Sequence, residues 1–302
     1  MDTYDRPEFF NTNPPIISRV DIGHDVFIER LDGAVAQRLS EHLSAGGVGS
    51  SSAQRYSFVR AFSPGVDPTD FDEDQRLQIA LALSRLIRPT SIGLEESAQV
   101  WGPLNDASAL TIRPGPITGP ASEAYVADLA RADWLTPADG IALRSLLDVF
   151  LVRGAPDRVR RGLWHYENAA RSFDMAARWS SVVTGLEALF NTDHEWVTRQ
   201  FKGRCTAVAE EFGVALSAKQ ADTAYRLRSR LSHGAITGVP PDTLQLYVAI
   251  ERVLRETLRQ SIEVDGWRDR FADEPAVRAA WPIEMPTDCP ACRQPLPRDD
   301  VE

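Results

Sequence analysis

Six segments with the hydrophobic periodicity of helices follow one another along the second half of the chain, and the connections between them are short. They span residues 136–152, 156–172, 174–190, 195–212, 217–234 and 241–263. Pro156 and Pro241 stand near helix starts, where a missing backbone N–H costs nothing, and Ser217 can cap the fifth helix. Long amphipathic helices joined by short loops predict an antiparallel helical bundle.

The first half of the chain has a mixed character. Residues 70–89 predict one helix, which starts on aspartates and stops at an Arg-Pro pair. Residues 31–47 have a helical period and end in two glycines. Residues 91–118 form β-like patches broken by glycine and proline, and they predict a small sheet. The sequence therefore predicts a mainly α protein with a mixed α/β N-terminal domain.

Shifts in composition divide the 302 residues into three parts. A chain of this length is long enough for two domains, or for one large domain with an appendage. We expect a mixed α/β domain of unknown role at residues 1–122, the helical bundle at residues 123–265, and a Pro-rich C-terminal tail at residues 266–302.

The composition is that of an ordinary soluble globular protein, with 43% hydrophobic and 25% charged residues. No apolar run is long enough for a membrane span, the first residues lack the pattern of a signal peptide, and three cysteines are too few for a disulfide framework. We therefore expect a cytoplasmic protein. The net charge of −10 argues against broad electrostatic binding of nucleic acid, but it allows a local basic cleft.

The decapeptide "YRLRSRLSHG" at residues 225–234 raises the question of a site. On a straight helix Arg228 and His233 would lie roughly 140° apart, whereas Arg230 and His233 would be neighbours. Gly234 ends the helix, and a helix that unwinds there can turn the imidazole toward Arg228. The alternative is that the arginines are solvated and that His233 interacts with carbonyls of the last turn.

Glu187 lies beside an apolar stripe on the third predicted helix. The stripe consists of Trp179, Val182, Val183, Leu186, Leu189 and Phe190. A carboxylate next to a core face either reaches water or meets a buried cation, and Arg204 or Arg228 could be that cation. Such a contact would fix the guanidinium and leave its other donors for a ligand. The alternative, an exposed Glu187 at the edge of the bundle, stays open.

Taken together, these residues resemble HEPN domains, in particular the Apea-like branch. The resemblance rests on "GLEALF" at 185–190, on Arg204, and on a motif of the form Y-x-x-R-S-x-x-x-H-G. That motif consists here of Tyr225, Arg228, Ser229, His233 and Gly234. The resemblance covers about residues 125–265, and the local departure is Gly185, where such domains more often have alanine.

The resemblance implies a metal-independent RNA endonuclease, usually a homodimer with its active site at the dimer cleft. The 2′-OH of the substrate attacks and leaves a 2′,3′-cyclic phosphate. Carried over by motif position, His233 transfers a proton, Arg228 stabilises the phosphorane charge, and Glu187 orients one of them. These roles suit the residue types, because imidazole titrates near neutrality and a guanidinium matches phosphate oxygens.

At the level of the family, the resemblance also implies a role in antiviral defence or toxin-like growth arrest, with RNA such as tRNA as substrate and an antitoxin or regulatory protein as a possible partner. Two other interpretations remain open. The first is a catalytically silent HEPN scaffold that binds a nucleotide, RNA or a protein. The second is a helical interaction module in which the motif is accidental.

Further residues are candidates for contact with the RNA. They are Arg204, Arg230, Ser229, Tyr225 and Lys202. For Lys202 and for the arginines of "DRVRRG", a solvated helix face is the competing explanation. We expect Trp164 and Tyr166 to be core aromatics rather than base-stacking residues. The remaining histidines lack a useful partner spacing and are expected to be structural: His24, His42, His165 and His194.

Cys289 and Cys292 form the first half of a zinc ribbon in the tail. A closed zinc site needs four ligands, and only Cys205, inside a predicted helix, remains as a further cysteine. The pair is either a decayed half-site or a zinc site shared between two chains. We expect no cofactor for catalysis, because the bundle has no Asp, Glu and His set at metal-ligand spacing.

Overall fold

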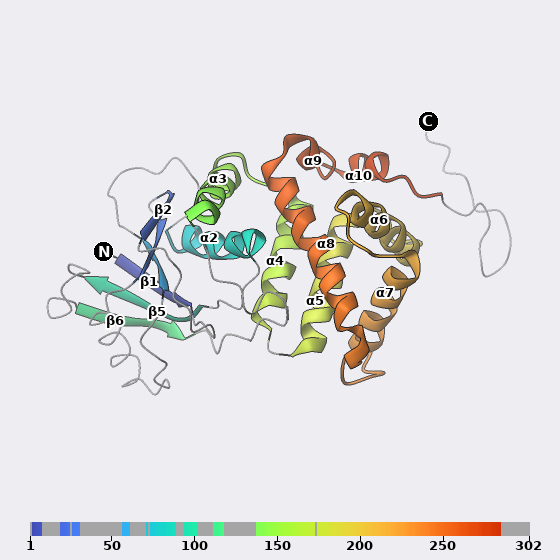
Figure 1. Cartoon of the computed structure of the whole chain (residues 1–302), viewed down its shortest axis with the longest axis horizontal. Helices are drawn as coiled ribbons and strands as arrows, with labels where there is room; N and C mark the ends of the chain where they lie inside the picture. Colours follow the sequence, from blue (N-terminus) through green and yellow to red (C-terminus); the bar gives the residue numbers. More distant parts are fainter. Residues whose placement is uncertain are drawn as a thin grey trace.

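The structure is a computed structural model that describes residues 2–7, 19–24, 26–30, 56–60, 71, 73–88, 94–101, 111–117, 137–172 and 174–284. Over these residues the protein is mainly helical. A sheet lies at one end of the molecule and a helical bundle at the other (Figure 1). None of the described helices combines the length and the apolar composition needed to cross a membrane.

The sheet has six strands in the order β2-β3-β4-β1-β5-β6, and every neighbouring pair is antiparallel. The strands are β1 (Asp2–Pro7), β2 (Arg19–Gly23), β3 (Val26–Arg30), β4 (Tyr56–Arg60), β5 (Leu94–Trp101) and β6 (Thr111–Ile117). Tyr4 of the central strand β1 lies opposite Val59 on one side and Ala98 on the other. The pairing with β5 shifts at Pro7, which has no N–H to donate to the ladder. Strands β5 and β6 occupy the region in which the sequence predicts a small sheet.

Every helix predicted between residues 136 and 263 is present. The helices are α3 (Pro137–Arg153), α4 (Asp157–Arg171), α5 (Met175–Phe190), α6 (Val197–Glu211), α7 (Ala218–Ser232) and α8 (Leu244–Glu263). The helix predicted at 70–89 is α2 (Glu73–Ile87), whereas the segment predicted as a helix at 31–47 lies outside the described residues. Helix α8 starts later than predicted, because Pro241–Thr243 form a short 3-10 turn (η2).

Helix α5 is the centre of the bundle, because it packs against α4, α6, α7 and α8. All six residues of its predicted apolar stripe are fully buried. Burial of each such side chain stabilises the fold by about 1.5–3 kcal/mol. The indole N–H of Trp179 donates to the carbonyl oxygen of Ala224 on α7 at 3.1 Å, so this buried donor is satisfied.

Gly185 lets α5 approach two neighbouring helices closely. A Cβ atom at this position would lie 2.9 Å from Cδ2 of Leu254 on α8 and 3.2 Å from Cβ of His165 on α4. Both distances are shorter than ordinary van der Waals contact, so an alanine would force the helices apart. The glycine at the point of departure from the HEPN pattern is therefore used for packing.

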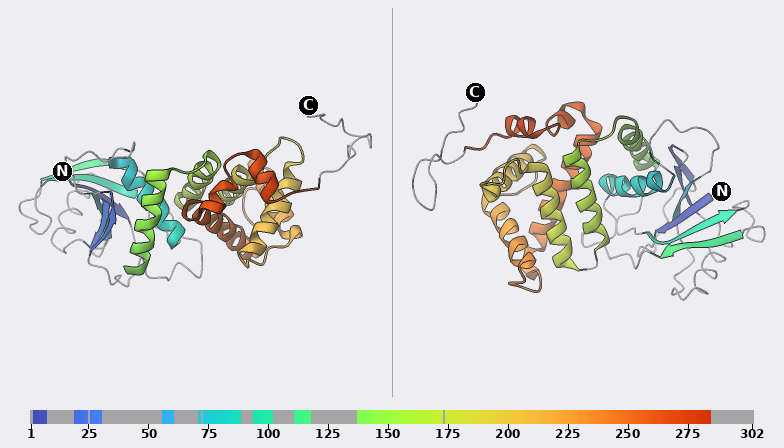
Figure 2. Two further views of the ribbon diagram at one scale, coloured as in Figure 1. Left: turned by 90° about the horizontal axis from the view of Figure 1, so that it is seen from above. Right: turned by 180° about the vertical axis from the view of Figure 1, so that it is seen from behind.

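Helices α2 and α3 lie between the sheet and the bundle (Figures 1 and 2). Helix α3 packs against β2, α2 and α8, and α2 packs against β4 and α8. Arg85 of α2 forms an ion pair with Glu167 of α4. The hydroxyl of Tyr166 donates to the Glu251 carboxylate of α8 at 2.8 Å and contacts the carbonyl oxygen of Arg85 at 3.3 Å. The division of the chain at residue 122 stays a prediction, and the structure packs helices from both sides of it together.

The predicted start of the C-terminal tail at residue 266 is wrong. Residues beyond it form α9 (Asp265–Asp269) and α10 (Glu274–Ala280), and Phe271, Val277 and Trp281 are buried. The rings of Phe271 and Trp281 pack together, and Trp281 meets Phe190 of α5 edge-on at 5.7 Å. The chain is proline-rich here, but Pro275 stands at a helix start, where proline is tolerated. Residues 285–302, which include Cys289 and Cys292, lie outside the described residues.

Candidate active site

Arg228 of α7 and Glu187 of α5 form an ion pair between helices. Nη2 of Arg228 lies 2.9 Å from Oε2 of Glu187, and the side chains are 27% and 15% exposed. The same Nη2 lies 3.5 Å from the hydroxyl oxygen of Thr184, one turn earlier on α5. Of the two cations that the sequence offers to Glu187, the structure selects Arg228.

The Arg228 side chain is held at one edge only. Within the described part of the chain, its Nη1 and Nε atoms make no hydrogen bond, and Nε is buried. A guanidinium has five N–H donors in a planar fork, and here Nη2 alone is occupied. Nη1 is therefore the donor of this partly exposed side chain that is left for a ligand such as a phosphate oxygen.

Tyr225 connects the ion pair to a third helix. Its side chain lies within reach of a hydrogen bond to Glu187 and to Thr198 in the first turn of α6. Burial, followed by the negative charge of Glu187, raises the pKa of the Tyr225 hydroxyl. Tyr225 therefore stays protonated and donates to the carboxylate. Thr198, Tyr225, Glu187 and Arg228 form one continuous set of contacts across α5, α6 and α7.

The Glu187 carboxylate is subject to opposing influences. Burial raises its pKa, and the charge of Arg228 and the hydrogen bond from Tyr225 oppose that shift, so that the net direction is upward. With its oxygens used by Arg228 and Tyr225, Glu187 holds the guanidinium in place rather than facing solvent as a free base.

His233 occupies the end of α7 and is exposed. Its backbone angles, φ −93° and ψ 7°, lie in the sparsely populated bridge region, where many active-site residues are found. Within the described residues its side chain forms no hydrogen bond or ion pair, so the structure does not join it to Arg228. Its exposure satisfies one requirement of the predicted role, because a histidine buried in an apolar core could not exchange protons with a substrate.

The helix stop predicted at Gly234 is confirmed. Gly234 has φ +67°, a left-handed conformation that favours glycine. The N–H of Ala235 donates to the carbonyl of Arg230 at 2.9 Å, and the N–H of Gly234 donates to that of Leu231 at 3.1 Å. This is a Schellman motif, and it fixes the backbone that carries His233. At the other end of α7, Ser217 forms the predicted cap as a capping box with Gln220.

Three further candidates lie on the surface of the bundle. Arg230 is exposed in the last turn of α7, and Ser229 is partly exposed beside Arg228. Lys202 is partly exposed on α6. Their positions are compatible with contact to an RNA, and that role stays a prediction for each of them.

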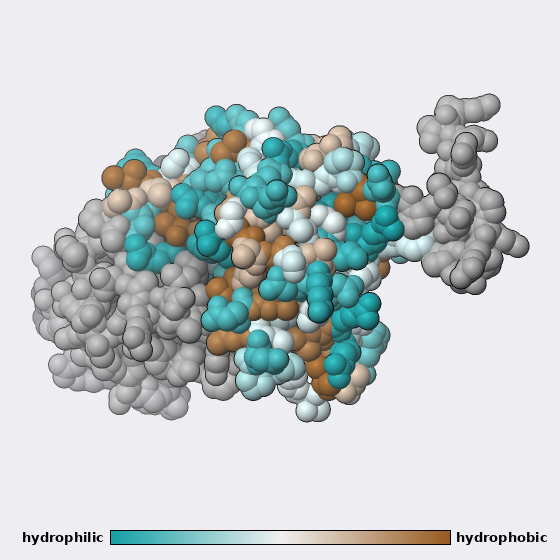
Figure 3. Space-filling view, turned by 45° about the vertical axis from the view of Figure 1, so that its right-hand side comes forward, coloured by the Kyte–Doolittle hydropathy of each residue, from teal (hydrophilic) through white to brown (hydrophobic). Residues whose placement is uncertain are grey.

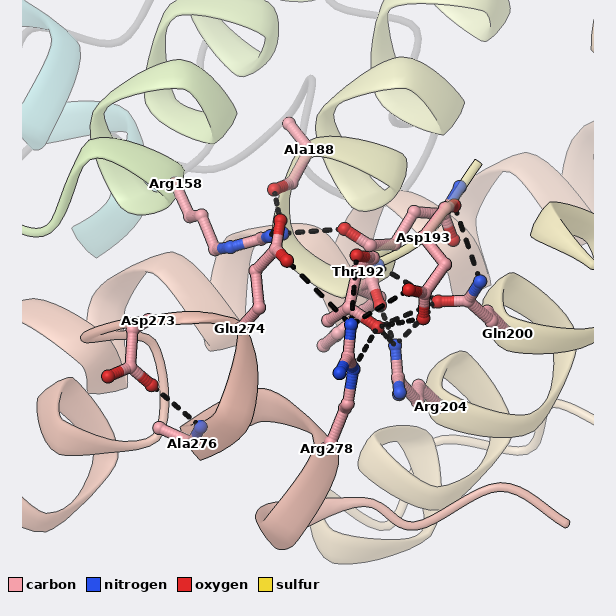
Figure 4. Close-up of polar contacts among 12 residues, drawn as sticks. Arg158, Ala188, Thr192, Asp193, Gln200, Arg204, Asp273, Glu274, Ala276 and Arg278 are labelled. Carbon is pink, nitrogen blue, oxygen red and sulfur yellow. Dashed lines mark hydrogen bonds and ion pairs between the residues drawn. The ribbon is translucent and has the colours of Figure 1, made fainter. Parts of the chain in front are cut away.

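Arg204 is not available as a substrate-binding residue, which corrects the sequence-based expectation. Its side chain is buried, and Nη1 donates to the carbonyl of Phe190, the hydroxyl of Thr192 at 3.2 Å and the amide oxygen of Gln200 at 3.0 Å (Figure 4). Nε donates to the carbonyl of Trp281 at 3.1 Å. Burial lowers the pKa of Arg204. Its structural role is to join the end of α5 to the segment after α10.

Two more arginines gather around the same end of α5: Arg158, one of the "DRVRRG" arginines, which is buried rather than on a solvated helix face, and Arg278, which the sequence did not single out (Figure 4). Arg158 donates to the carbonyls of Ala188 and Asn191 at 3.2 and 2.6 Å. Arg278 donates to the Thr192 carbonyl at 3.4 Å and pairs with Asp193 at 2.8 Å. The last carbonyls of a helix lack backbone partners and carry partial negative charge, which attracts cations. This arginine cluster is a helix cap rather than a catalytic site.

His165 is nearer to the candidate site than the sequence suggested. It is partly buried on α4, where it packs next to Gly185, and the charge of Arg228 reaches it. Burial first, and the Arg228 charge second, lower its pKa. The ring of Trp164 contacts it edge-on at 4.7 Å. Trp164 itself is 62% exposed, so the expectation that it is a core aromatic is wrong, whereas Tyr166 is buried as predicted.

Metal binding was predicted only at Cys289 and Cys292, and this pair lies outside the described residues. Over the part of the chain that the structure describes, no group of three His, Cys, Asp or Glu side chains is arranged to hold a metal ion. Cys205 is buried on α6, and burial raises the pKa of its thiol well above the usual value. This thiol is therefore a packing residue.

The site thus consists of the Arg228 guanidinium, a partly buried carboxylate that holds it, a neighbouring tyrosine, and an exposed imidazole at the end of the helix that carries Arg228. Comparisons with known proteins found no match for the chain among protein-family models, curated proteins or solved structures.

Proposed function

We propose that the chain is a HEPN-type RNA endonuclease that cleaves by attack of the substrate's own 2′-OH and needs no metal ion for catalysis. The observation that carries this proposal is the Arg228 side chain, whose Nη2 is held by Glu187 while its Nη1 has no partner in the described part of the chain. An exposed histidine five positions further along the same helix supplies the second group that the chemistry requires.

In the proposed reaction the 2′-oxygen forms a bond to phosphorus and the bond from phosphorus to the 5′-oxygen breaks. The proton of the 2′-OH must leave, and the departing 5′-oxygen must gain one. His233 carries out a proton transfer, for which imidazole is suited near neutral pH. Arg228 binds the non-bridging oxygens as they gain charge, and Glu187 and Tyr225 keep it oriented. The products are a 2′,3′-cyclic phosphate and a 5′-hydroxyl.

The reaction needs two proton transfers, and each chain supplies one motif histidine. A homodimer in which two copies of the motif face each other across a cleft provides two imidazoles and two guanidinium groups. We therefore include a homodimer with a shared active site in the proposal.

Hydrophilic residues cover most of the described surface in the view of Figure 3, with small apolar patches among them. The N-terminal α/β part then serves in regulation or substrate selection.

The substrate that follows from this proposal is RNA, with tRNA as one candidate. The cellular setting would be a cytoplasmic enzyme of antiviral defence or of toxin-like growth arrest, held in check by an antitoxin or another regulatory protein. This setting comes from the resemblance to the HEPN family alone and rests on the nuclease activity.

The test is incubation of the protein with total RNA or tRNA in the presence of EDTA. Wild-type protein is expected to cleave, and His233→Ala and Arg228→Ala are each expected to slow cleavage by about a hundredfold or more. Arg226→Ala is the matched control. Arg226 lies on the same helix, is exposed and pairs with Asp222, and it is expected to cleave like the wild type.

The ends of the products test the mechanism. A 2′,3′-cyclic phosphate is expected, whereas a 3′-hydroxyl end would contradict attack by the 2′-OH. Equal cleavage by the wild type and both variants would remove the assigned roles of Arg228 and His233. Binding of RNA without cleavage under any condition would instead favour the silent scaffold.

A further inference from the structure

A groove with a volume of about 730 Å³ lies at the start of α6. It is lined by Trp196, Val197, Thr198, Arg199, Lys202, Gly203 and Ile283. Its volume lies in the range of about 300–1,000 Å³ that is usual for sites that bind small molecules, and one or two nucleotides fit in such a space.

The groove adjoins the candidate active site through Thr198. This residue lines the groove and lies within hydrogen-bonding reach of Tyr225, which is in turn next to Glu187, the partner of Arg228. Three side chains therefore connect the groove to the guanidinium that is proposed to bind the scissile phosphate.

Two cations of the groove have no intramolecular partner in the described part of the chain. Arg199 is exposed, Lys202 is partly exposed, and neither forms an ion pair there. Because they are three residues apart on a helix, they lie on the same side of α6. In a protein with a net charge of −10, two adjacent unpaired cations in one groove are the local basic feature that an anionic ligand requires.

Trp196 at the edge of the groove has an unusual backbone conformation. Its φ of 55° and ψ of 27° lie in the left-handed region, which costs a residue with a side chain about 1 kcal/mol. The surrounding structure holds it there, since its carbonyl accepts the N–H groups of Arg199 at 2.8 Å and of Gln200 at 3.0 Å. A strained residue that lines a groove points to a functional use of its side chain.

The wall of the groove opposite the helix depends on the segment after α10. Gly203 makes room for Ile283, because a Cβ at position 203 would collide with that side chain. The segment is fixed by Arg204, which donates to the carbonyl of Trp281. The buried Arg204 therefore contributes to the groove as a positioning residue, although it does not reach the substrate.

We propose that this groove binds the nucleotides of single-stranded RNA next to the scissile phosphate, with Arg199 and Lys202 on backbone phosphates and Trp196 stacking on a base. The proposal deepens the proposed nuclease function and rests on it. The combination of a basic track with an aromatic ring is the usual means of binding single-stranded nucleic acid without reading its sequence. The groove thus determines affinity and strand type rather than the chemical step.

Binding is measured with a fluorescent single-stranded RNA by anisotropy at several salt concentrations, in the His233→Ala background so that the RNA stays intact. The double variant Arg199→Ala/Lys202→Ala is expected to bind more weakly. The slope of log Kd against log salt concentration should fall by about 0.7 for each cation removed. Trp196→Ala should weaken binding roughly tenfold, and Trp196→Phe should retain most of the affinity because it keeps an aromatic ring.

Lys219→Ala is the matched control, because this exposed lysine lies in the first turn of α7, at the other end of the α6–α7 pair. Cleavage by otherwise wild-type protein gives a second measurement. The groove variants should raise KM for a long single-stranded RNA, whereas Lys219→Ala should leave KM unchanged.

The proposal is supported if the groove variants bind RNA more weakly and with a smaller salt dependence of Kd, while Lys219→Ala binds like the wild type. Unchanged binding in the Arg199→Ala/Lys202→Ala variant, together with cleavage by the wild type, would overturn the groove and leave the nuclease function intact. No binding and no cleavage of RNA by the wild-type protein would overturn both.

Discussion

At the scale of single residues, Glu187 shows how a partly buried carboxylate can serve a site without taking part in the chemistry. One oxygen pairs with Arg228, and the carboxylate also accepts a hydrogen bond from Tyr225. Burial nevertheless raises its pKa, so its ionised form is held at a cost to stability. Such a cost is reasonable where the charge is needed to orient a cation.

Glu187→Gln is expected to reduce cleavage while keeping the fold. Glutamine retains an acceptor for Tyr225 but lacks the charge that fixes Arg228, and the misplaced guanidinium should slow cleavage roughly tenfold to a hundredfold. Cleavage at the wild-type rate in this variant would show that Glu187 is dispensable for positioning. The control for folding is urea unfolding at neutral pH, where the two proteins should differ by no more than about 1 kcal/mol.

The same pair of proteins tests the direction of the pKa shift. In the wild type the folded state binds the Glu187 proton more tightly than the unfolded state does. This contribution to stability is fully present below the unfolded pKa and is lost as the pH rises through the folded pKa. The free energy of unfolding of the wild type, relative to Glu187→Gln, should therefore fall as the pH rises through that window. A rise would mean that the attraction of Arg228 outweighs burial.

The residues of the site differ in how well sequence could predict them. Arg228 and Glu187 were predictable because their charges must be satisfied, and a charge beside an apolar stripe implies a partner. Arg204 could not be assigned correctly, because its donors go to backbone carbonyls, which have no sequence signature. His165 was missed for a similar reason, since its position depends on the close approach that Gly185 permits.

At the scale of elements, the hydrophobic periodicity of the sequence predicts the long helices but not the short ones. Helices α3 to α8 each have enough turns for an apolar stripe to be recognised. Helices α9 and α10 are only five and seven residues long, and prolines flank or occupy the second. Their place in the fold is determined by aromatic contacts of Phe271 and Trp281 with the bundle, which are tertiary and leave no period in the sequence.

Gly185→Ala tests the contact among α4, α5 and α8. The added methyl group would lie 3.2 Å from Cβ of His165, which cannot move without its helix, so overpacking should destabilise the protein by about 1–3 kcal/mol, offset in part by the better helix propensity of alanine. Urea unfolding measures the change. Gly266→Ala on α9 is the control, because nothing lies within 4 Å of its would-be Cβ and no loss is expected. A Gly185→Ala protein as stable as the wild type would mean that the helices move apart at no cost.

At the scale of the whole molecule, the sheet and the bundle are linked by packed helices rather than by a bare connection. Helices α2 and α3 contact both parts, and the buried Tyr166 hydroxyl contacts α8 and α2 at once. The sequence predicted a small sheet in the first half and a helical bundle in the second half from composition and periodicity. It could not predict this joint, because the contacts bring together residues more than eighty positions apart.

The proposed homodimer makes a prediction about the molecule as a whole. If one active site contains groups from two chains, a protein with Arg228→Ala retains His233, and a protein with His233→Ala retains Arg228. Mixing the two inactive variants under conditions that exchange subunits should then restore part of the cleavage, because a mixed dimer contains one guanidinium and one imidazole.

Light scattering measures the oligomeric state of the wild type and of the mixture, and RNA cleavage measures the restored activity. The matched control combines each variant with Arg228→Ala/His233→Ala protein, whose dimers with either partner lack one of the two groups. A dimeric wild type whose mixed variants stay inactive would contradict an active site that works with one Arg228 and one His233 from different chains. If both groups acted within one subunit instead, the exposed His233 would have to turn toward Arg228, a movement that the Schellman motif at Gly234 would have to permit.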